Sequence, residues 1–164
     1  MLFRSESVTA RDQLFATLDP TMRKLVLPSG RTVILSDTVG FVSDLPHELV
    51  AAFRATLEEV LEADIIIHVR DIAHPESESQ KRDVEDVLRQ LGIAVEEHDP
   101  HPPRPLIAAL NKIDLLGDVA RSPVMGMAAR APATVAISAV TGEGLPKLLA
   151  MIDGELARGR RSEE

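Results

Sequence analysis

The stretch Leu106-Ile-Ala-Ala-Leu-Asn-Lys-Ile-Asp114 decides the fold. An unbroken apolar run fills its first part and stops at the polar pair Asn111-Lys112. Short continuous apolar runs are typical of strands that are buried on both faces of a parallel sheet. Open α/β sheets bind their ligands at the carboxyl ends of such strands. The sequence therefore predicts an inner strand over Leu106–Leu110 with a functional loop after it.

Similar apolar runs recur on both sides of this stretch. The turn signal Pro28-Ser29-Gly30 separates the first two of them, which are expected to form a hairpin. The predicted strands are Leu25–Leu27, Arg31–Ser36, Ile65–Val69, Leu106–Leu110 and Thr134–Ile137.

Amphipathic segments alternate with these strands. The expected helices run from Pro46 to about Ala63, from His74-Pro75 to Gly92, and over Leu145 to Leu156. Residues 115–132 predict only a short helix within a loop. The alternation indicates one α/β domain, a three-layer open sheet that is mostly parallel and contains one antiparallel hairpin.

The composition excludes several classes of protein. Lys and Arg total 18 against 26 Asp and Glu, a net charge of −8, so we expect no DNA partner bound through bulk charge. The absence of cysteine excludes disulfides and thiolate–zinc sites. No apolar run is long enough for a membrane span, and no signal peptide is visible. A cytoplasmic protein is therefore expected.

Three polar motifs follow three of the predicted strands. They are Asp37-Thr38-Val39-Gly40, Asn111-Lys112-Ile113-Asp114 and Ser138-Ala139. Each motif alone is weak and could be an ordinary turn after a strand. Their order, and their shared position at strand ends, make the combination specific.

The residue types of the second and third motifs suit a guanine base. The carboxylate of Asp114 can accept hydrogen bonds from N1–H and from the exocyclic amine, a pair that adenine does not offer. Such polar sites discriminate by roughly 10⁴ or more. Lys112 can lay its aliphatic stem along the base, and Asn111 can tie the loop to its neighbours. The backbone N–H of Ala139 can donate to the base carbonyl, while Ser138 holds that turn.

The first motif suits the phosphates and their metal. Asp37 is a suitable partner for Mg²⁺ through a water molecule, because Mg²⁺ keeps part of its hydration shell. Gly40 allows a backbone N–H to approach a terminal phosphate, a contact that only a triphosphate provides. Upstream, Thr17 offers a hydroxyl, although by itself its segment reads as a plain turn that ends at Pro20.

These motifs resemble a known family. The strings Asp12–Pro20, Ser36–Pro46, Asn111–Asp114 and Ser138–Gly144 resemble the G domain of HflX, a translational GTPase of the Obg-HflX group. The segments Leu49–Ala63 and His68–Pro75 fit it as well, so the resemblance covers roughly residues 8–157. It implies a Ras-like fold of the P-loop NTPase class, and a GTPase that requires Mg²⁺.

The resemblance also implies the site. Thr17 would contact Mg²⁺ and the γ-phosphate, and Asp37 would reach the metal through water. Phe41 stands where many GTPases place a water-orienting Gln, which implies slow, partner-assisted hydrolysis; simple core packing is the other reading. No catalytic residue is assigned. The implied contacts to GTP or GDP are Phe15, Ala16, Thr17, Leu18, Asp19, Asp37, Thr38, Val39, Gly40, Asn111, Lys112, Ile113, Asp114, Ser138, Ala139 and Val140.

The family binds ribosomes, which implies the large subunit, its RNA and its proteins as partners, a role in splitting or rescue of stalled ribosomes, and a monomer. Two features depart from the family. The sequence has no G-x-x-x-x-G-K-[ST] motif, and the family's N-terminal domain is missing. We therefore expect residues 1–164 to be a truncated G domain that starts just after the phosphate-binding loop and ends in a frayed tail over 158–164.

This truncation has expected consequences. A strand would be missing from the sheet, which would leave a gap with unpaired edges. The chain should bind GTP far more weakly than a version extended through the phosphate loop. The alternative function is a domain without that loop which serves as a protein- or ribosome-interaction module and hydrolyses nothing.

Other candidates have plainer readings. His98 and His101 could form a metal pair, but a solvated loop is favoured because no third ligand is near. His47, His68 and His74 could titrate near neutral pH; surface or strand-end positions are the favoured reading. Arg158-Gly-Arg-Arg161 could touch ribosomal RNA or simply belong to the tail.

Overall fold

The computed structural model describes residues 21–37, 60–90, 92–93 and 104–159. Strands and helices alternate along these residues, as the hydrophobic pattern predicts. In chain order the elements are β1 (Thr21–Val26), β2 (Thr32–Asp37), β3 (Ile66–Asp71), α2 (Ser77–Gln90), β4 (Leu106–Asn111), the short 3₁₀ helix η1 (Ile113–Leu115), α3 (Asp118–Arg130), β5 (Thr134–Ala136) and α4 (Leu145–Gly159).

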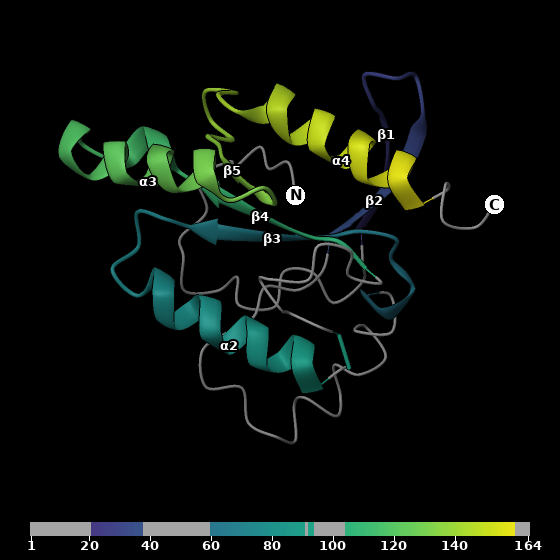
Figure 1. Ribbon diagram of the computed structural model, residues 1–164, viewed down its shortest axis with the longest axis horizontal. Coiled ribbons are helices and arrows are strands. Elements are labelled where there is room, and N and C mark those ends of the chain that lie inside the picture. The colour runs from purple at the N-terminus through teal and green to yellow at the C-terminus, as the bar shows by residue number, and fades with distance from the viewer. Residues whose placement is uncertain (1–20, 38–59, 91, 94–103, 160–164) are drawn as a thin grey trace.

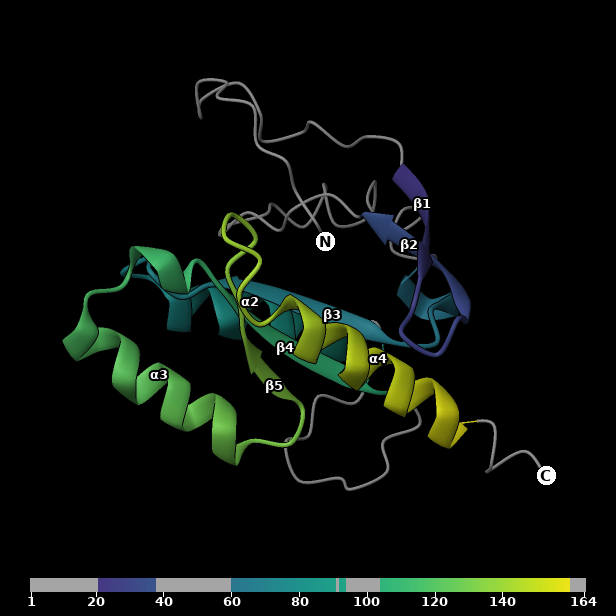
Figure 2. The same cartoon turned by 90° about the horizontal axis from the view of Figure 1, so that it is seen from above.

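The strands form two sheets. β3, β4 and β5 are parallel and adjacent in that order, whereas β1 and β2 form a separate antiparallel hairpin beside them (Figure 2). This arrangement confirms the α/β fold with one antiparallel hairpin. Within the described residues no backbone hydrogen bond joins the two sheets.

Helices cover both faces of the parallel sheet. Ile107 and Ala109 of β4 pack in one apolar cluster with α4 and the hairpin residue Leu27. Leu110, on the opposite face of the same strand, packs in a second cluster with Ala128 of α3. Successive side chains of a strand point to opposite faces, so α4 and α3 lie on opposite sides of the sheet. Figure 1 shows α4 above and α2 below β3, which gives three layers.

The hairpin differs from its prediction in its bounds. Leu25–Leu27 was expected as a short strand, but β1 begins at Thr21 and ends before Leu27. Exposed Arg23 and Lys24 lie inside the strand, where the antiparallel partner satisfies the backbone and no apolar run is needed. β2 is shifted by one residue from the predicted Arg31–Ser36.

The tip of the hairpin is held to α4. The backbone N–H and the hydroxyl of Ser29 donate to the two carboxylate oxygens of Asp153, at 2.9 and 2.7 Å. Leu27 is 2% exposed and enters the cluster between the hairpin and α4. These contacts attach the hairpin to the rest of the molecule by its turn.

Two helix ends are clear in the hydrogen bonding. α2 begins at Ser77 and not at the predicted His74-Pro75, because those residues form a turn in which Ser77 N–H donates to the His74 carbonyl at 3.1 Å. The predicted stop at Gly92 is confirmed: its φ is 78°, and its N–H donates to Arg89.

α3 corrects the prediction for residues 115–132. It is a helix of 13 residues, longer than the short helix expected. Its apolar pattern is weak, since Ala128 is its buried residue and Pro123 lies in its interior. Proline cannot donate the intrahelical hydrogen bond to the carbonyl of Val119, and Val119 is an exposed residue at the start of the helix.

The two remaining helix predictions fall partly outside the described residues. Of the predicted helix from Pro46 to about Ala63, residues 60–62 are described and are helical, and Arg104 donates to the carbonyls of Val60 and Leu61. Of the tail expected over 158–164, Arg158 and Gly159 are helical and form the end of α4. Residues 160–164 lie outside the described part.

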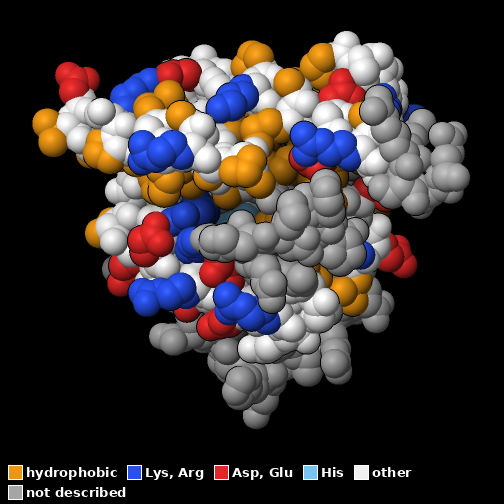
Figure 3. Space-filling view, viewed as in Figure 1, with side chains coloured by type: hydrophobic (Ala, Val, Ile, Leu, Met, Phe, Trp, Pro, Cys, Tyr) orange, Lys and Arg blue, Asp and Glu red, His pale blue; other side chains and the backbone are white. Residues whose placement is uncertain are grey.

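The surface divides by residue type. In Figure 3 hydrophobic side chains gather over α3 and α4, while positive and negative side chains mix over α2. No helix among the described residues is both long enough and apolar enough to cross a membrane. Large exposed hydrophobic residues on and near α3 are Leu115, Val119, Met125 and Met127.

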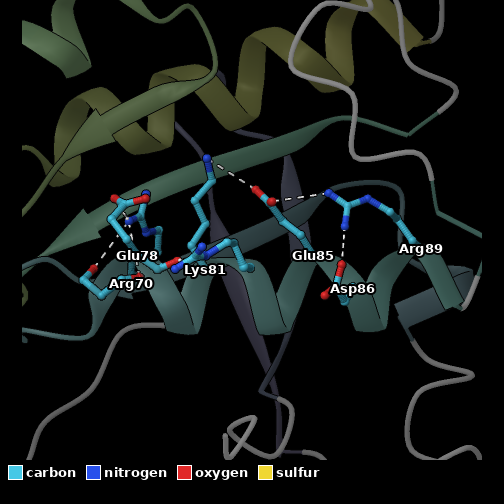
Figure 4. A network of polar contacts seen from close by, with 8 residues as sticks. Arg70, Glu78, Lys81, Glu85, Asp86 and Arg89 are labelled. Atoms are coloured by element: carbon cyan, nitrogen blue, oxygen red, sulfur yellow. Dashed lines mark hydrogen bonds and ion pairs between the residues drawn. The ribbon is translucent and has the colours of Figure 1, made fainter.

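Polar contacts join the end of β3 to the start of α2. Arg70 is 7% exposed, and its Nη2 atom lies 2.5 Å from Glu78 Oε1 and 3.4 Å from the Ser77 hydroxyl (Figure 4). The hydrogen bond from Arg70 lowers the pKa of Glu78. Figure 4 also shows Glu85 between Lys81 and Arg89 along the same helix. The sequence run Ile65–Val69 suggested apolar surroundings on both faces, but this face carries charge.

His68 of β3 makes folding dependent on pH. Burial, with help from the charges of Arg70 and Lys81, lowers its pKa from 6.5 to about 4. The unfolded chain therefore binds the proton first, and the stability that neutral His68 contributes is lost as pH falls from 6.5 towards 4. We expect His68 to reduce the free energy of unfolding by about 3 kcal/mol at the lower pH.

Urea unfolding of the parent chain and of His68→Gln, between pH 7 and pH 4, measures this effect. The carboxylates contribute equally to both proteins, so the variant should lose less stability over the same range. Parallel pH profiles for the two proteins would contradict the prediction.

Candidate functional site

One hydrogen bond joins the loops that follow β4 and β5. The side-chain oxygen of Asn111, the last residue of β4, accepts the backbone N–H of Ala139 at 3.0 Å. Backbone bonds reinforce this link, since Ile137 N–H donates to Leu110 at 2.8 Å and Ile113 N–H donates to Ile137 at 3.3 Å. The two loops therefore form one unit at the carboxyl edge of the sheet.

The same hydrogen bond uses a donor that the sequence predicted to bind a ligand. The N–H of Ala139 was expected to donate to a base carbonyl, but in this structure it donates to Asn111. A ligand carbonyl at this position would share the N–H with the Asn111 oxygen or replace it.

Hydrogen bonds between neighbouring residues fix the conformation of the loop after β5. Ser138 is fully buried, and its hydroxyl accepts the N–H of Thr141 at 3.1 Å. The N–H of Ser138 donates to Glu143, and the N–H of Gly142 donates back to Ser138, both at 2.9 Å. Gly144 closes the loop with a φ of 75°.

The loop after β4 turns sharply at Lys112. This residue has φ 70° and ψ 32°, and it is the non-glycine residue with positive φ in the described part of the chain. Its Nζ atom lies 2.6 Å from Oδ2 of Asp71, at the end of β3. Lys112 thus connects the ends of two neighbouring strands.

Asp114 presents a carboxylate on this turn. The preceding Ile113 is fully buried and anchors η1, and the N–H of Leu115 donates to Lys112 at 3.0 Å. Asp114 itself is exposed and makes no hydrogen bond or ion pair with any described residue. A fixed backbone therefore carries an acceptor pair that is available to a ligand.

Arg121 of α3 braces both loops. Its Nη1 atom donates to the carbonyl of Ile113 at 3.4 Å, and its Nη2 atom forms an ion pair with Glu143. Sequence reasoning missed this residue because it did not extend a helix through residue 121. Glu143 lies in the string Ser138–Gly144 that carried the resemblance, but it was given no role.

Asp37 lies at the end of β2, in the other sheet. Its Oδ1 atom is buried without a hydrogen-bond partner. Burial raises the pKa of this carboxyl, and the charge of Arg23 acts in the opposite direction. Within the described residues no hydrogen bond or ion pair joins Asp37 to the loops after β4 and β5.

The remaining candidates are not all described. Phe15–Asp19, Thr38–Gly40 and Phe41 lie outside the described residues, as do His98 and His101. Val140 is 80% exposed beside Ala139. The described ranges contain no group of three or more His, Asp or Glu residues that could hold a metal.

Comparison with known proteins identifies the family. A family model described as "50S ribosome-binding GTPase" matches residues 1–112. GTPase HflX of Magnetococcus marinus is 44% identical over 160 residues, which cover 96% of this chain and 34% of the relative. The chain belongs to the HflX family of GTPases. The match to the family model includes Asp37, Asn111 and Lys112, while the loop after β5 lies beyond it.

Other HflX relatives agree. GTPase HflX of Caldanaerobacter subterraneus subsp. tengcongensis is 49% identical over 145 residues, 88% of this chain and 30% of that protein. Putative GTP-binding protein 6 of Homo sapiens is 42% identical over 161 residues, 94% of this chain and 28% of that protein. The chain thus spans about a third of the length of the curated relatives that it matches.

A solved structure supports the fold. The crystal structure of an SsGBP variant matches 90% of this chain and 50% of that chain, with a TM-score of 0.67 and 24% identity. At this identity the match supports the architecture alone, a Ras-like G-domain arrangement of strands and helices.

Proposed function

We propose that this chain binds GTP and GDP at the edge formed by the loops after β4 and β5, and that it serves an HflX-type cycle of GTP hydrolysis. The hydrogen bond between Asn111 and Ala139 carries the proposal, because it makes one unit of the two loops. Asp114 stands on that unit, exposed and without a partner among the described residues. The relatives named as GTPases support the assignment.

The chemistry of the site favours guanine. The two oxygens of Asp114 accept the N1–H and the exocyclic amine, while the stem of Lys112 covers one face of the ring. The base carbonyl accepts the N–H of Ala139. It either shares this N–H with the side-chain oxygen of Asn111 or replaces that oxygen as the acceptor. Adenine would leave the carboxylate unpaired, which is the costly outcome for a polar site.

The proposed function includes Mg²⁺. The buried, unpartnered Oδ1 of Asp37 is a hard oxygen donor of the kind that Mg²⁺ and its water shell prefer. We propose that Asp37 holds the ion through water, with Thr17 as the second contact and the backbone of Thr38–Gly40 towards the terminal phosphate. When bound, the ion neutralises charge on the phosphates.

A fluorescence titration tests nucleotide binding. The full chain is titrated with labelled GTP, GDP and ATP, with and without Mg²⁺. We expect binding of both guanine nucleotides and a much lower affinity for ATP, and we expect Mg²⁺ to strengthen GTP binding. Equal affinities for GTP and ATP would overturn the guanine assignment.

The proposed partner is the large ribosomal subunit in the cytoplasm, with a role in splitting or rescuing stalled ribosomes. The support is the family model, whose description names 50S ribosome binding. Sedimentation with purified 50S or 30S subunits tests it, in the presence of GDP or of a non-hydrolysable GTP analogue. We expect a monomeric chain to sediment with 50S subunits when the GTP analogue is present. Equal sedimentation with 30S subunits would contradict the proposal.

A second candidate is an interaction module that hydrolyses nothing. One observation favours it: residues 1–164 contain no G-x-x-x-x-G-K-[ST] motif to cradle the phosphates. Sedimentation with 50S subunits that is independent of nucleotide, together with no phosphate release, would favour this candidate over the first.

A further inference from the structure

Asp71 has no assigned role, yet it lies against the proposed base-binding loop. It is the last residue of β3 and the register partner of Asn111 in β4. The N–H of Ile72 donates to the Asn111 carbonyl at 3.0 Å, which continues the pairing beyond the strand. The end of β3 is therefore fixed beside the loop that begins at Lys112.

The carboxylate of Asp71 is held from two sides. Its Oδ1 atom accepts the N–H of Ala73 at 3.1 Å, within its own turn. Its Oδ2 atom contacts Lys112 Nζ at 2.6 Å. Because the turn already orients the carboxylate, only the lysine side chain loses conformational entropy when the ion pair forms. Exposed ion pairs usually contribute little, but this one is 28% exposed at Asp71, and the acid is already in place.

Lys112 needs such a partner. Its left-handed backbone conformation is unfavourable for a residue with a Cβ, and its side chain has a flexible four-carbon stem. The contact with Asp71 fixes the far end of that stem. The stem is then held between the end of β4 and the end of β3, instead of moving in solvent.

We propose that Asp71 is a positioning residue for the base: it anchors the ammonium of Lys112 so that the lysine stem forms a fixed surface for the purine. This inference rests on the proposed function. Asp71 acts through Lys112 and does not touch the nucleotide. Its contribution should therefore be the same for GDP and GTP, whatever the number of phosphates.

Asp71→Asn tests the proposal in the full chain, with labelled GDP and GTP as probes. We expect both affinities to fall by about tenfold, the size of a charge-assisted contact. Lys112→Met should cause a similar loss, and Asp71→Asn should add nothing to it. Glu78→Gln is the matched control, since it removes the acid of a different ion pair at β3, the one between Arg70 and Glu78 of α2, and it should bind like the parent.

The outcomes separate this inference from the proposed function. If the parent binds guanine nucleotides and Asp71→Asn binds them equally well, the role of Asp71 is overturned and the proposed function is not. A loss that is larger for GTP than for GDP would overturn it too, because it would place Asp71 with the phosphates. A parent that binds no guanine nucleotide would end both. If Asp71→Asn fails to fold by circular dichroism, Lys112→Met decides the question.

Discussion

Asp114→Asn is expected to weaken GTP binding by about a thousandfold and to create a preference for xanthosine triphosphate. Guanine presents two donors to Asp114, whereas the Asn side chain offers one acceptor and one donor group. The NH₂ group of the Asn side chain would face the exocyclic amine of guanine, and two donors cannot form a hydrogen bond. Xanthine carries a carbonyl at that position, which accepts from the amide, so the mismatch becomes a hydrogen bond.

The measurement is a competition titration of labelled GTP and XTP against the parent and the variant. Asp118→Asn is the matched control, because it makes the same exchange at an exposed aspartate in the first turn of α3. The control should keep the parent's preference. An Asp114→Asn protein with unchanged selectivity would show that this carboxylate does not read the base.

Gly144→Ala is expected to lower the free energy of unfolding by about 4 kcal/mol. A Cβ on Gly144 would lie 2.1 Å from the carbonyl oxygen of Ala136, and the φ of 75° is unfavourable for alanine. That carbonyl belongs to β5, and Ala136 is buried in the cluster between this strand and α3, so the backbone there has little room to move away. The loop that contains Ser138 and Ala139 would lose its fixed position.

Gly30→Ala supplies the control, measured by urea unfolding of both variants and the parent. Gly30 has a φ of 83° in the hairpin turn, but nothing lies within 4 Å of the position of its Cβ. It should therefore show only the backbone cost, about 1 kcal/mol. Equal losses for the two variants would mean that the close approach to Ala136 contributes nothing.

Much of the fold follows from local sequence signals. The run Leu106–Leu110 is apolar without interruption, and the structure gives an inner strand there with Asn111 added at its end. Gly92 ends α2 because the chain needs a positive φ at that point. The position of Asn111 next to the loop after β5 was also accessible, since both motifs follow strands of one parallel sheet.

Other features depend on contacts between distant residues. The pairing of Asp71 with Lys112 requires the register of β3 against β4, which no local pattern specifies. Arg121 reaches Ile113 and Glu143 from the first turn of α3, a helix that the sequence obscures because Pro123 lies within it. The charge of the β3 face towards α2 is likewise visible only once Arg70 is seen beside Glu78.

The division into two sheets gives the molecule two units that can open separately. The hairpin carries Asp37, yet within the described residues its polar attachment to the rest is Ser29 with Asp153, supported by the burial of Leu27. The amide hydrogens of the hairpin can thus exchange with solvent when the hairpin detaches locally, whereas those of β4 exchange only when the whole molecule unfolds. Asp37, which we propose holds Mg²⁺ through water, therefore belongs to the less stable unit, and the loops proposed to bind the base belong to the more stable one.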